Sequence, residues 1–151
     1  MKIKDFLQIY QKSGFVQTLA ACIKPNENLC VAFRGLSGSL DAVIAAALYQ
    51  LNHQPFLFIM YDKEEAAYFQ NDLQNLLPDK KVLFFPSSYK KPYTFEETDN
   101  ANILMRAEIL NRINNKLSNG ELIVTYPEAL TEKVINKRSL RENTFTARTG
   151  E

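Results

Sequence analysis

The sequence predicts an α/β domain of three layers, in which helices cover both faces of a mainly parallel sheet of about four strands. Two observations favour this class. Short, continuous apolar runs alternate with amphipathic helical patterns, and such runs are typical of parallel strands buried on both faces. The length of 151 residues and the apolar fraction of 46% fit one globular domain. Ligands of such sheets bind at the carboxyl ends of the strands, which directs attention to residues 34–39, the turn after Tyr61 and residues 86–98.

The first third of the chain predicts a helix, a strand and a second helix. Residues 6–23 form a pattern of one or two amphipathic helices, interrupted near Ser13. Residues 28–33, NLCVAF, are a continuous apolar run and are expected to be a buried strand. A helix starts near Leu40, because apolar residues then recur every three or four positions up to Leu51.

The middle of the chain continues this alternation. Residues 55–61, PFLFIMY, are expected to be a second buried strand. Asp62 then caps a helix, and Glu65 three residues later completes a capping box. Pro78 ends this helix before a third strand at residues 81–85.

The last predicted elements are a helix, a strand and a short helix. The first helix opens at Thr98 or Asp99, and its predicted inward face consists of Ile103, Ala107, Leu110 and Leu117. Residues 121–126, ELIVTY, predict the fourth strand. Pro127 suits the first position of a short helix.

Composition and charge exclude several classes of protein. The net charge of +1 gives no global field that would attract nucleic acid or an anionic membrane. No apolar run approaches the roughly 20 residues of a membrane helix, and the charged N-terminal segment does not resemble a secretory signal. Cys22 and Cys30 suit a reducing compartment and are predicted to be core residues, which indicates a cytoplasmic protein. With His53 as the single histidine, no metal site is predicted.

A phosphate-binding loop is the first candidate site, in the segment VAFRGLSGSLDAVIAAAL. A working loop has the pattern G-x-x-x-x-G-K-[ST], in which the lysine reaches the outer phosphates and the hydroxyl holds magnesium. Aligned on Gly35, the second glycine, the lysine and the hydroxyl residue are replaced by Leu40, Asp41 and Ala42. Exchanging lysine for aspartate turns an attraction of about 4 kcal/mol into a repulsion of similar size.

Two interpretations of this loop remain open from its residues. Gly35, Ser37, Gly38 and Ser39 are compatible with a former phosphate loop that has lost nucleotide binding. The other interpretation is an ordinary turn between strand and helix, in which Ser39 caps the helix and Asp41 interacts with its dipole.

The second group of candidates is a basic, aromatic segment and one arginine. Tyr89, Lys90, Lys91 and Tyr93 combine positive charge with stacking surfaces, as in proteins that bind single-stranded nucleic acid. The acidic residues of 96–99 follow directly and cancel that charge, so a packed loop or an interface is the competing interpretation. Arg106 is a further candidate for nucleic-acid or interface contact, and the competing interpretation is an ion pair with Asp99 or Glu108 on the solvated face of its helix.

Four segments in order and spacing carry a family resemblance: FRGLSGSLDAVIAAAL, FPSSYKKPY, RAEILNRI and LIVTYPEAL. Together they resemble the N-terminal module of the bacterial transcription-repair coupling factors, the Mfd family. That module is similar to the nucleotide-binding domain of the excision-repair protein UvrB, so the resemblance implies a RecA-like fold over residues 1–140. It also implies that residues 141–151 begin the next domain, which contacts UvrA.

The resemblance implies a function without catalysis by this chain. UvrB has a working phosphate loop, whereas the Leu40, Asp41 and Ala42 positions depart from its pattern. The family's ATP-dependent motor lies in a later part of the protein, and residues 86–99 are too short for the long aromatic hairpin with which UvrB probes DNA. Tyr93 matches a tyrosine of the family pattern and is expected to anchor its loop, and the helix of Arg106 carries an arginine in the family.

The implied role is a structural module in nucleotide-excision repair that supports recruitment of UvrA to stalled RNA polymerase. The implied partners are the other domains of the parent protein, UvrA through the adjacent domain, and RNA polymerase and DNA through distant domains. No catalytic residue, cofactor, metal or membrane contact is expected. The alternatives are residual nucleotide or anion binding at the 35–41 loop through helix N-terminal amides, and weak DNA binding through residues 89–93.

Overall fold

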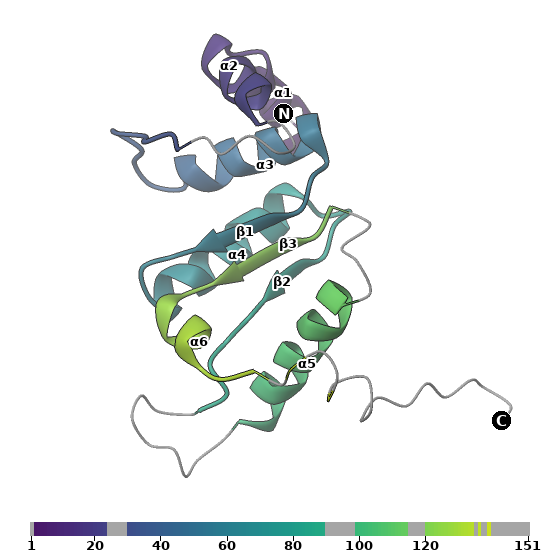
Figure 1. The fold of residues 1–151 in the computed structure, drawn as a ribbon. Coiled ribbons are helices and arrows are strands. Elements are labelled where there is room, and N and C mark those ends of the chain that lie inside the picture. The colour runs from purple at the N-terminus through teal and green to yellow at the C-terminus, as the bar shows by residue number, and fades with distance from the viewer. Residues whose placement is uncertain are drawn as a thin grey trace, which may run out of the picture.

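The computed structural model describes residues 2–23, 30–89, 99–114, 120–134, 136 and 139. In these residues the chain forms a parallel three-stranded sheet in the order β1-β3-β2, with β1 at Phe56–Ile59, β2 at Val82–Phe84 and β3 at Leu122–Thr125 (Figure 1). The central strand β3 is buried along its whole length. The predicted α/β class with a parallel sheet is therefore confirmed.

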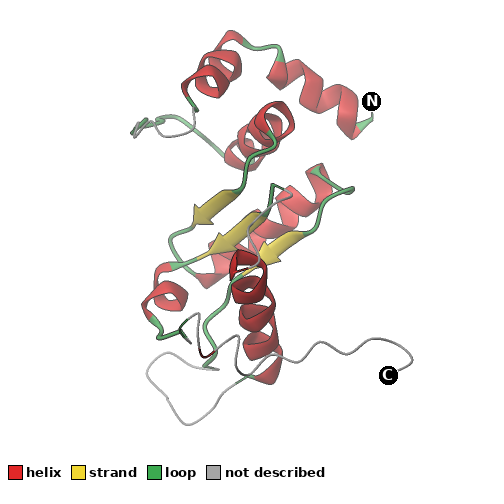
Figure 2. Ribbon diagram, turned by 45° about the vertical axis from the view of Figure 1, so that its right-hand side comes forward, coloured by secondary structure: helices red, strands yellow, loops and turns green. Residues whose placement is uncertain are grey.

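The described residues contain six helices: α1 (Ile3–Gln11), α2 (Gly14–Cys22), α3 (Leu40–Asn52), α4 (Lys63–Leu76), α5 (Asn100–Asn114) and α6 (Pro127–Thr131). Helix α4 packs against β2 and β3, and α5 packs against β2 from the opposite face (Figure 2). Helix α3 contacts α1, α2 and α4 and lies between the α1–α2 pair and the sheet (Figure 1). Of these helices, none is both long and apolar enough to span a membrane within the described residues.

Side-chain caps mark the starts of helices α2 and α4, as the sequence predicted. The predicted break near Ser13 is confirmed, because the Ser13 side chain accepts a hydrogen bond from Val16 N–H at 3.3 Å and starts α2. Asp62 Oδ1 accepts one from Glu65 N–H at 2.8 Å, and Glu65 Oε2 accepts one from Tyr61 N–H at 2.9 Å. These reciprocal bonds confirm the predicted cap of α4, although the glutamate reaches the residue before Asp62.

The prediction of a strand at residues 28–33 is wrong for the residues that the structure describes. Residues 30–33 are exposed and have no regular structure, and residues 28 and 29 lie outside the described ranges. Phe33 packs the edge of its ring against Phe15 of α2, with the ring centroids 5.5 Å apart. An apolar run has strand propensity, but a strand also needs a neighbouring backbone to pair with. In this segment the Phe33 side chain packs against helix α2 instead.

The sequence predicted that β1 would be buried on both faces, but only one of its faces is buried. Leu57 and Ile59 are 56% and 55% exposed, whereas Phe56 and Phe58 pack against the core. The cause is the position of β1 at the edge of the sheet, where α5 does not cover it. Cys30 is likewise exposed rather than in the core, and Cys22 is half-buried.

Candidate functional site

Residues 35–39 are exposed and lead directly into α3, whose first two residues, Leu40 and Asp41, are half-buried. Gly35 and Gly38 have φ values of 79° and 59°, a conformation that glycine adopts without strain. Ser39 occupies the N-cap position, but its side chain makes no cap hydrogen bond with the described residues. Instead, Asp41 Oδ1 accepts a hydrogen bond from Ala42 N–H at 2.7 Å. An amide in the first turn of α3, where an anion would bind, is thus already paired with a carboxylate of the protein.

A pocket of about 260 Å³ lies at the carboxyl ends of the strands. It brings together two of the predicted ligand-binding segments, the turn after Tyr61 and the start of residues 86–98. Among the described residues, none of 34–39 lines it; the lining consists of Asp62, Lys63, Glu64, Ser87, Tyr89, Tyr126 and Glu128. Three carboxylates face one ammonium group there, and this excess of negative charge opposes phosphate binding.

Arg106 is the centre of a buried cluster of polar groups. Its side chain is only 7% exposed and reaches from α5 to the segments that follow β2 and β3. Its Nη1 donates hydrogen bonds to the carbonyl oxygens of Pro86 at 2.7 Å and of Ala129 at 3.0 Å. Its guanidinium carbon lies 4.2 Å from the centroid of the Phe85 ring. One side chain therefore holds together α5, the loop after β2, and α6.

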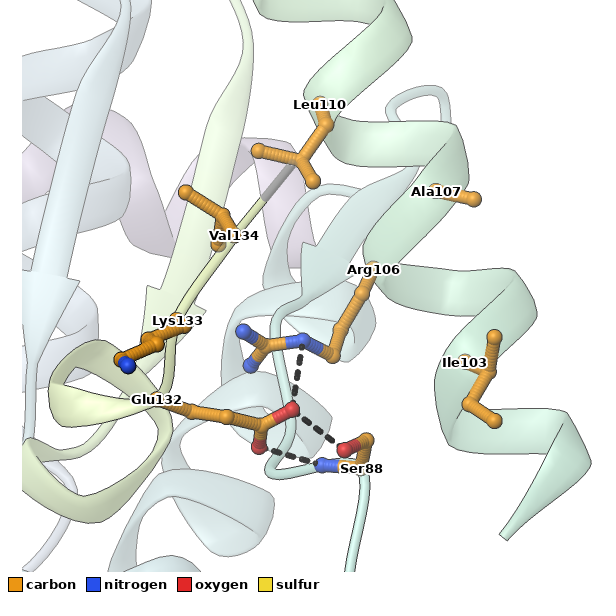
Figure 3. A pocket seen from close by; sticks show the side chains of 8 residues that line it. All are labelled: Ser88, Ile103, Arg106, Ala107, Leu110, Glu132, Lys133 and Val134. Atoms are coloured by element: carbon orange, nitrogen blue, oxygen red, sulfur yellow. Dashed lines mark hydrogen bonds and ion pairs between the residues drawn. The ribbon is translucent and has the colours of Figure 1, made fainter. Parts of the chain in front are cut away.

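Glu132 is the acidic partner of Arg106, with 3.6 Å between Glu132 Oε1 and Arg106 Nε (Figure 3). Ser88 donates to both carboxylate oxygens, through Oγ to Oε1 and through its backbone N–H to Oε2 at 2.8 Å. Ser87 Oγ also donates to Oε2, at 3.2 Å. Each oxygen of this largely buried carboxylate thus has two partners, which offsets the cost of removing it from water.

Burial and hydrogen bonding act in opposite directions on the pKa values of this cluster. Burial alone raises the pKa of Glu132, but hydrogen bonds from Ser88 and Ser87 and the charge of Arg106 outweigh it and hold the pKa below its ordinary value. Burial lowers the pKa of Arg106, and Glu132 opposes that effect. Burial raises the pKa of Tyr126, against the hydrogen bond that Ser87 N–H donates to its hydroxyl oxygen.

The location of Arg106 corrects the expectation of a solvated ion pair. Glu108, its predicted partner, instead pairs with Lys81 at 2.8 Å and Arg112 at 3.0 Å on the exposed face. The buried face of α5 carries Arg106 and Ile109. Of the predicted inward residues, two are exposed, one is half-buried and one lies outside the described ranges, in the order Ile103, Ala107, Leu110 and Leu117.

Of the basic, aromatic segment, the structure describes Tyr89 alone. Tyr89 is half-buried and lines the acidic pocket, which does not favour contact with DNA phosphates. Lys90, Lys91 and Tyr93 lie outside the described residues, so their role stays a prediction. Sequence reasoning missed Glu132, and no local pattern signals it, because its partners come from distant segments.

Glu132 predicts a specific loss of stability in acid. Its folded-state pKa is lower than the unfolded value of about 4.3, so its contribution is complete above that pH and is lost as pH falls through the folded pKa. We expect Glu132→Gln to unfold more easily in urea at pH 7 and to differ less from the parent chain towards pH 3. The matched control is Glu128→Gln, since Glu128 lies on α6, the helix that Glu132 directly follows, and forms no ion pair with the described residues. A constant difference between Glu132→Gln and the parent at all pH values would contradict this role.

The fold and the Arg106 cluster define the chain as an α/β domain with a small parallel sheet. In this domain a buried arginine–glutamate pair links α5 to the segments that follow β2 and β3. Over 102 residues, 67% of its length, the chain is 33% identical to the transcription-repair-coupling factor of Bacillus subtilis (strain 168). The chain is therefore related to a transcription-repair-coupling factor over this stretch, which makes up 8% of the Bacillus protein. No family model matches the chain, and no solved structure does.

Proposed function

We propose that the chain is a non-catalytic structural and interaction module of a transcription-repair coupling factor in nucleotide-excision repair. The relation to the Bacillus protein supports this process. In this proposal the module has a UvrB-like, RecA-like ancestry and works in the cytoplasm. Its neighbouring domain, which starts near residue 141, recruits UvrA. Distant domains of the parent protein contact RNA polymerase and DNA, and the ATP-dependent motor is among them.

The observation that carries the non-catalytic role is the hydrogen bond from Ala42 N–H to Asp41 Oδ1. In a working phosphate loop the amides of this turn hold phosphate, and a lysine occupies the position of Asp41. Here the first-turn amide has a carboxylate as its partner, and a bound phosphate would meet that negative charge. The acidic pocket at the carboxyl ends of the strands supports the same conclusion.

Titration with a fluorescent ATP analogue and magnesium tests this proposal. We expect a Kd weaker than about 100 μM, which corresponds to roughly 5.5 kcal/mol of binding free energy. Asp41→Asn is the matched variant, because it removes the charge and keeps the shape of the side chain. Similarly weak binding by both chains is expected, since Leu40 and Ala42 also lack the required chemistry. Saturable, magnesium-dependent binding tighter than this limit would favour residual nucleotide binding at the 35–41 loop.

A further inference from the structure

We propose that the exposed face of β1 and the acidic pocket beside it form one docking surface for an amphipathic, arginine-bearing helix of a partner protein. The docking surface consists of an apolar stripe, Leu57, Ile59 and Tyr61, and of the pocket of about 260 Å³ whose lining includes Asp62, the next residue along the chain. This inference rests on the proposed role as an interaction module and adds the surface and the chemistry of the partner.

The apolar stripe lies on the same face of the sheet as α5. Exposure alternates residue by residue over 55–61, so Leu57, Ile59 and Tyr61 share one face of the strand, and they are 56%, 55% and 84% exposed. Ile123 of β3 is paired with Leu57 and lies on the same face, but it is buried. Helix α5 packs against β2, which lies on the other side of β3 from β1 (Figure 1). Among the described residues, no helix covers the stripe.

The dimensions of the stripe suit a helix. An apolar sheet face is normally buried against a helix, and an exposed apolar patch with a polar rim is typical of an interaction site. From residue 57 to residue 61 the stripe is about 13 Å long, at about 3.3 Å per residue. Leucines at positions i, i+4 and i+7 of a helix span about 10 Å, so two turns of an amphipathic helix cover this length.

The acidic pocket selects the charge of that helix. Asp62, Glu64 and Glu128 line the pocket together with Lys63, so three carboxylates face one ammonium group. No described residue forms an ion pair with Glu64 or Glu128. A cationic side chain complements this charge, and the two tyrosine rings of the lining favour the guanidinium group of arginine, which stacks on aromatic faces.

The same charge disfavours a second copy of the chain as the occupant. A two-fold dimer joins the same surface patch of both copies. In each copy the stripe is followed by Asp62 and Glu64, so pairing of two stripes supplies no positive charge to either pocket.

Two synthetic peptides test the proposal by NMR on the chain of 151 residues. The first, acetyl-ALQAALQALAQARQ-amide, has leucines at the spacing given above and an arginine one turn further; the second has citrulline, the neutral isostere, in place of arginine. We expect saturable shifts of the Leu57 and Ile59 methyl signals and of the Glu64 amide signal. The arginine peptide is expected to bind at least about tenfold more tightly, because its hydrogen bonds to carboxylates are charge-assisted. Equal binding of the two peptides, or no shifts at these residues, would overturn the proposal.

Variants of the chain locate the surface. Leu57→Gln is expected to weaken binding of both peptides at least about tenfold, because it removes a leucine contact from the stripe. The matched control is Leu104→Gln, since Leu104 is 70% exposed on α5, and it is expected to leave binding unchanged. The double variant Glu64→Gln/Glu128→Gln is expected to remove the preference for arginine. Equal effects of the two leucine variants, or an unchanged preference in the double variant, would contradict the proposal.

Sedimentation velocity of the chain without peptide tests the competing occupant. A monomer is expected. A dimer that Leu57→Gln dissociates would mean that a second copy covers the stripe, and the proposed occupant would be wrong. The proposed function stands in that case, since its own test is nucleotide binding at the 35–41 loop.

Discussion

Replacing Arg106 with methionine is expected to lower the free energy of unfolding by about 3 kcal/mol or more. The substitution keeps most of the volume but leaves the largely buried Glu132 carboxylate without its cationic partner, and removing one member of a buried pair typically costs this much. It also removes the donors to the carbonyl oxygens of Pro86 and Ala129. Urea unfolding at pH 7, followed by circular dichroism, measures the change.

Arg112→Met is the matched control on the same helix. Arg112 also pairs with two glutamates, Glu108 at 3.0 Å and Glu121 at 3.2 Å, but its side chain is 39% exposed. Exposed ion pairs contribute about 0–1 kcal/mol, so the control is expected to lose less than about 1 kcal/mol. If both variants lost the same small amount, Arg106 would not hold the three segments together.

Gly120→Ala is expected to destabilise the fold by about 3 kcal/mol. Gly120 precedes β3 with a φ of 62°, where other residues are strained by roughly 1–3 kcal/mol. A Cβ atom at this position would also lie 2.5 Å from the carbonyl oxygen of His53, which is backbone and cannot rotate away. Overpacking of this kind adds about 1–3 kcal/mol. Thermal unfolding of the variant measures the combined effect as a lower Tm.

Gly35→Ala separates the two causes. Gly35 has a similar φ of 79°, but a Cβ atom there would have no heavy atom within 4 Å. This control is expected to lose about 1 kcal/mol, from backbone strain alone. A Tm equal to that of Gly120→Ala would mean that the approach to His53 contributes nothing.

Local rules predicted most of the elements of this fold. The caps at Ser13 and Asp62 and the proline at the start of α6 depend on neighbours within a few residues, so the sequence alone identifies them. The strand prediction at residues 28–33 was wrong because strand formation does not depend on local residues alone. Pairing depends on a distant backbone, and the apolar pattern of this segment does not say whether one is present.

The site was less predictable because its contacts are distant in sequence. Apolar residues occur on several sides of α5, so periodicity favoured Ile103 and Ala107 as the inner face, and both are exposed. Arg106 is inside because carbonyl oxygens beyond β2 and in α6, together with Glu132, satisfy its guanidinium group. An arginine with such partners is indistinguishable from a surface arginine until the fold is known.

The strand order β1-β3-β2 has a consequence for synthesis of the chain. Within the part of the chain that the structure describes, strands β1 and β2 pair only with β3, and β3 is the last of the three in the sequence. During translation β1 and β2 therefore leave the ribosome before their pairing partner β3 exists. The sheet can form only after residue 125 has been synthesised. Until then the nascent chain exposes two apolar strand segments, a period in which chaperone binding competes with aggregation.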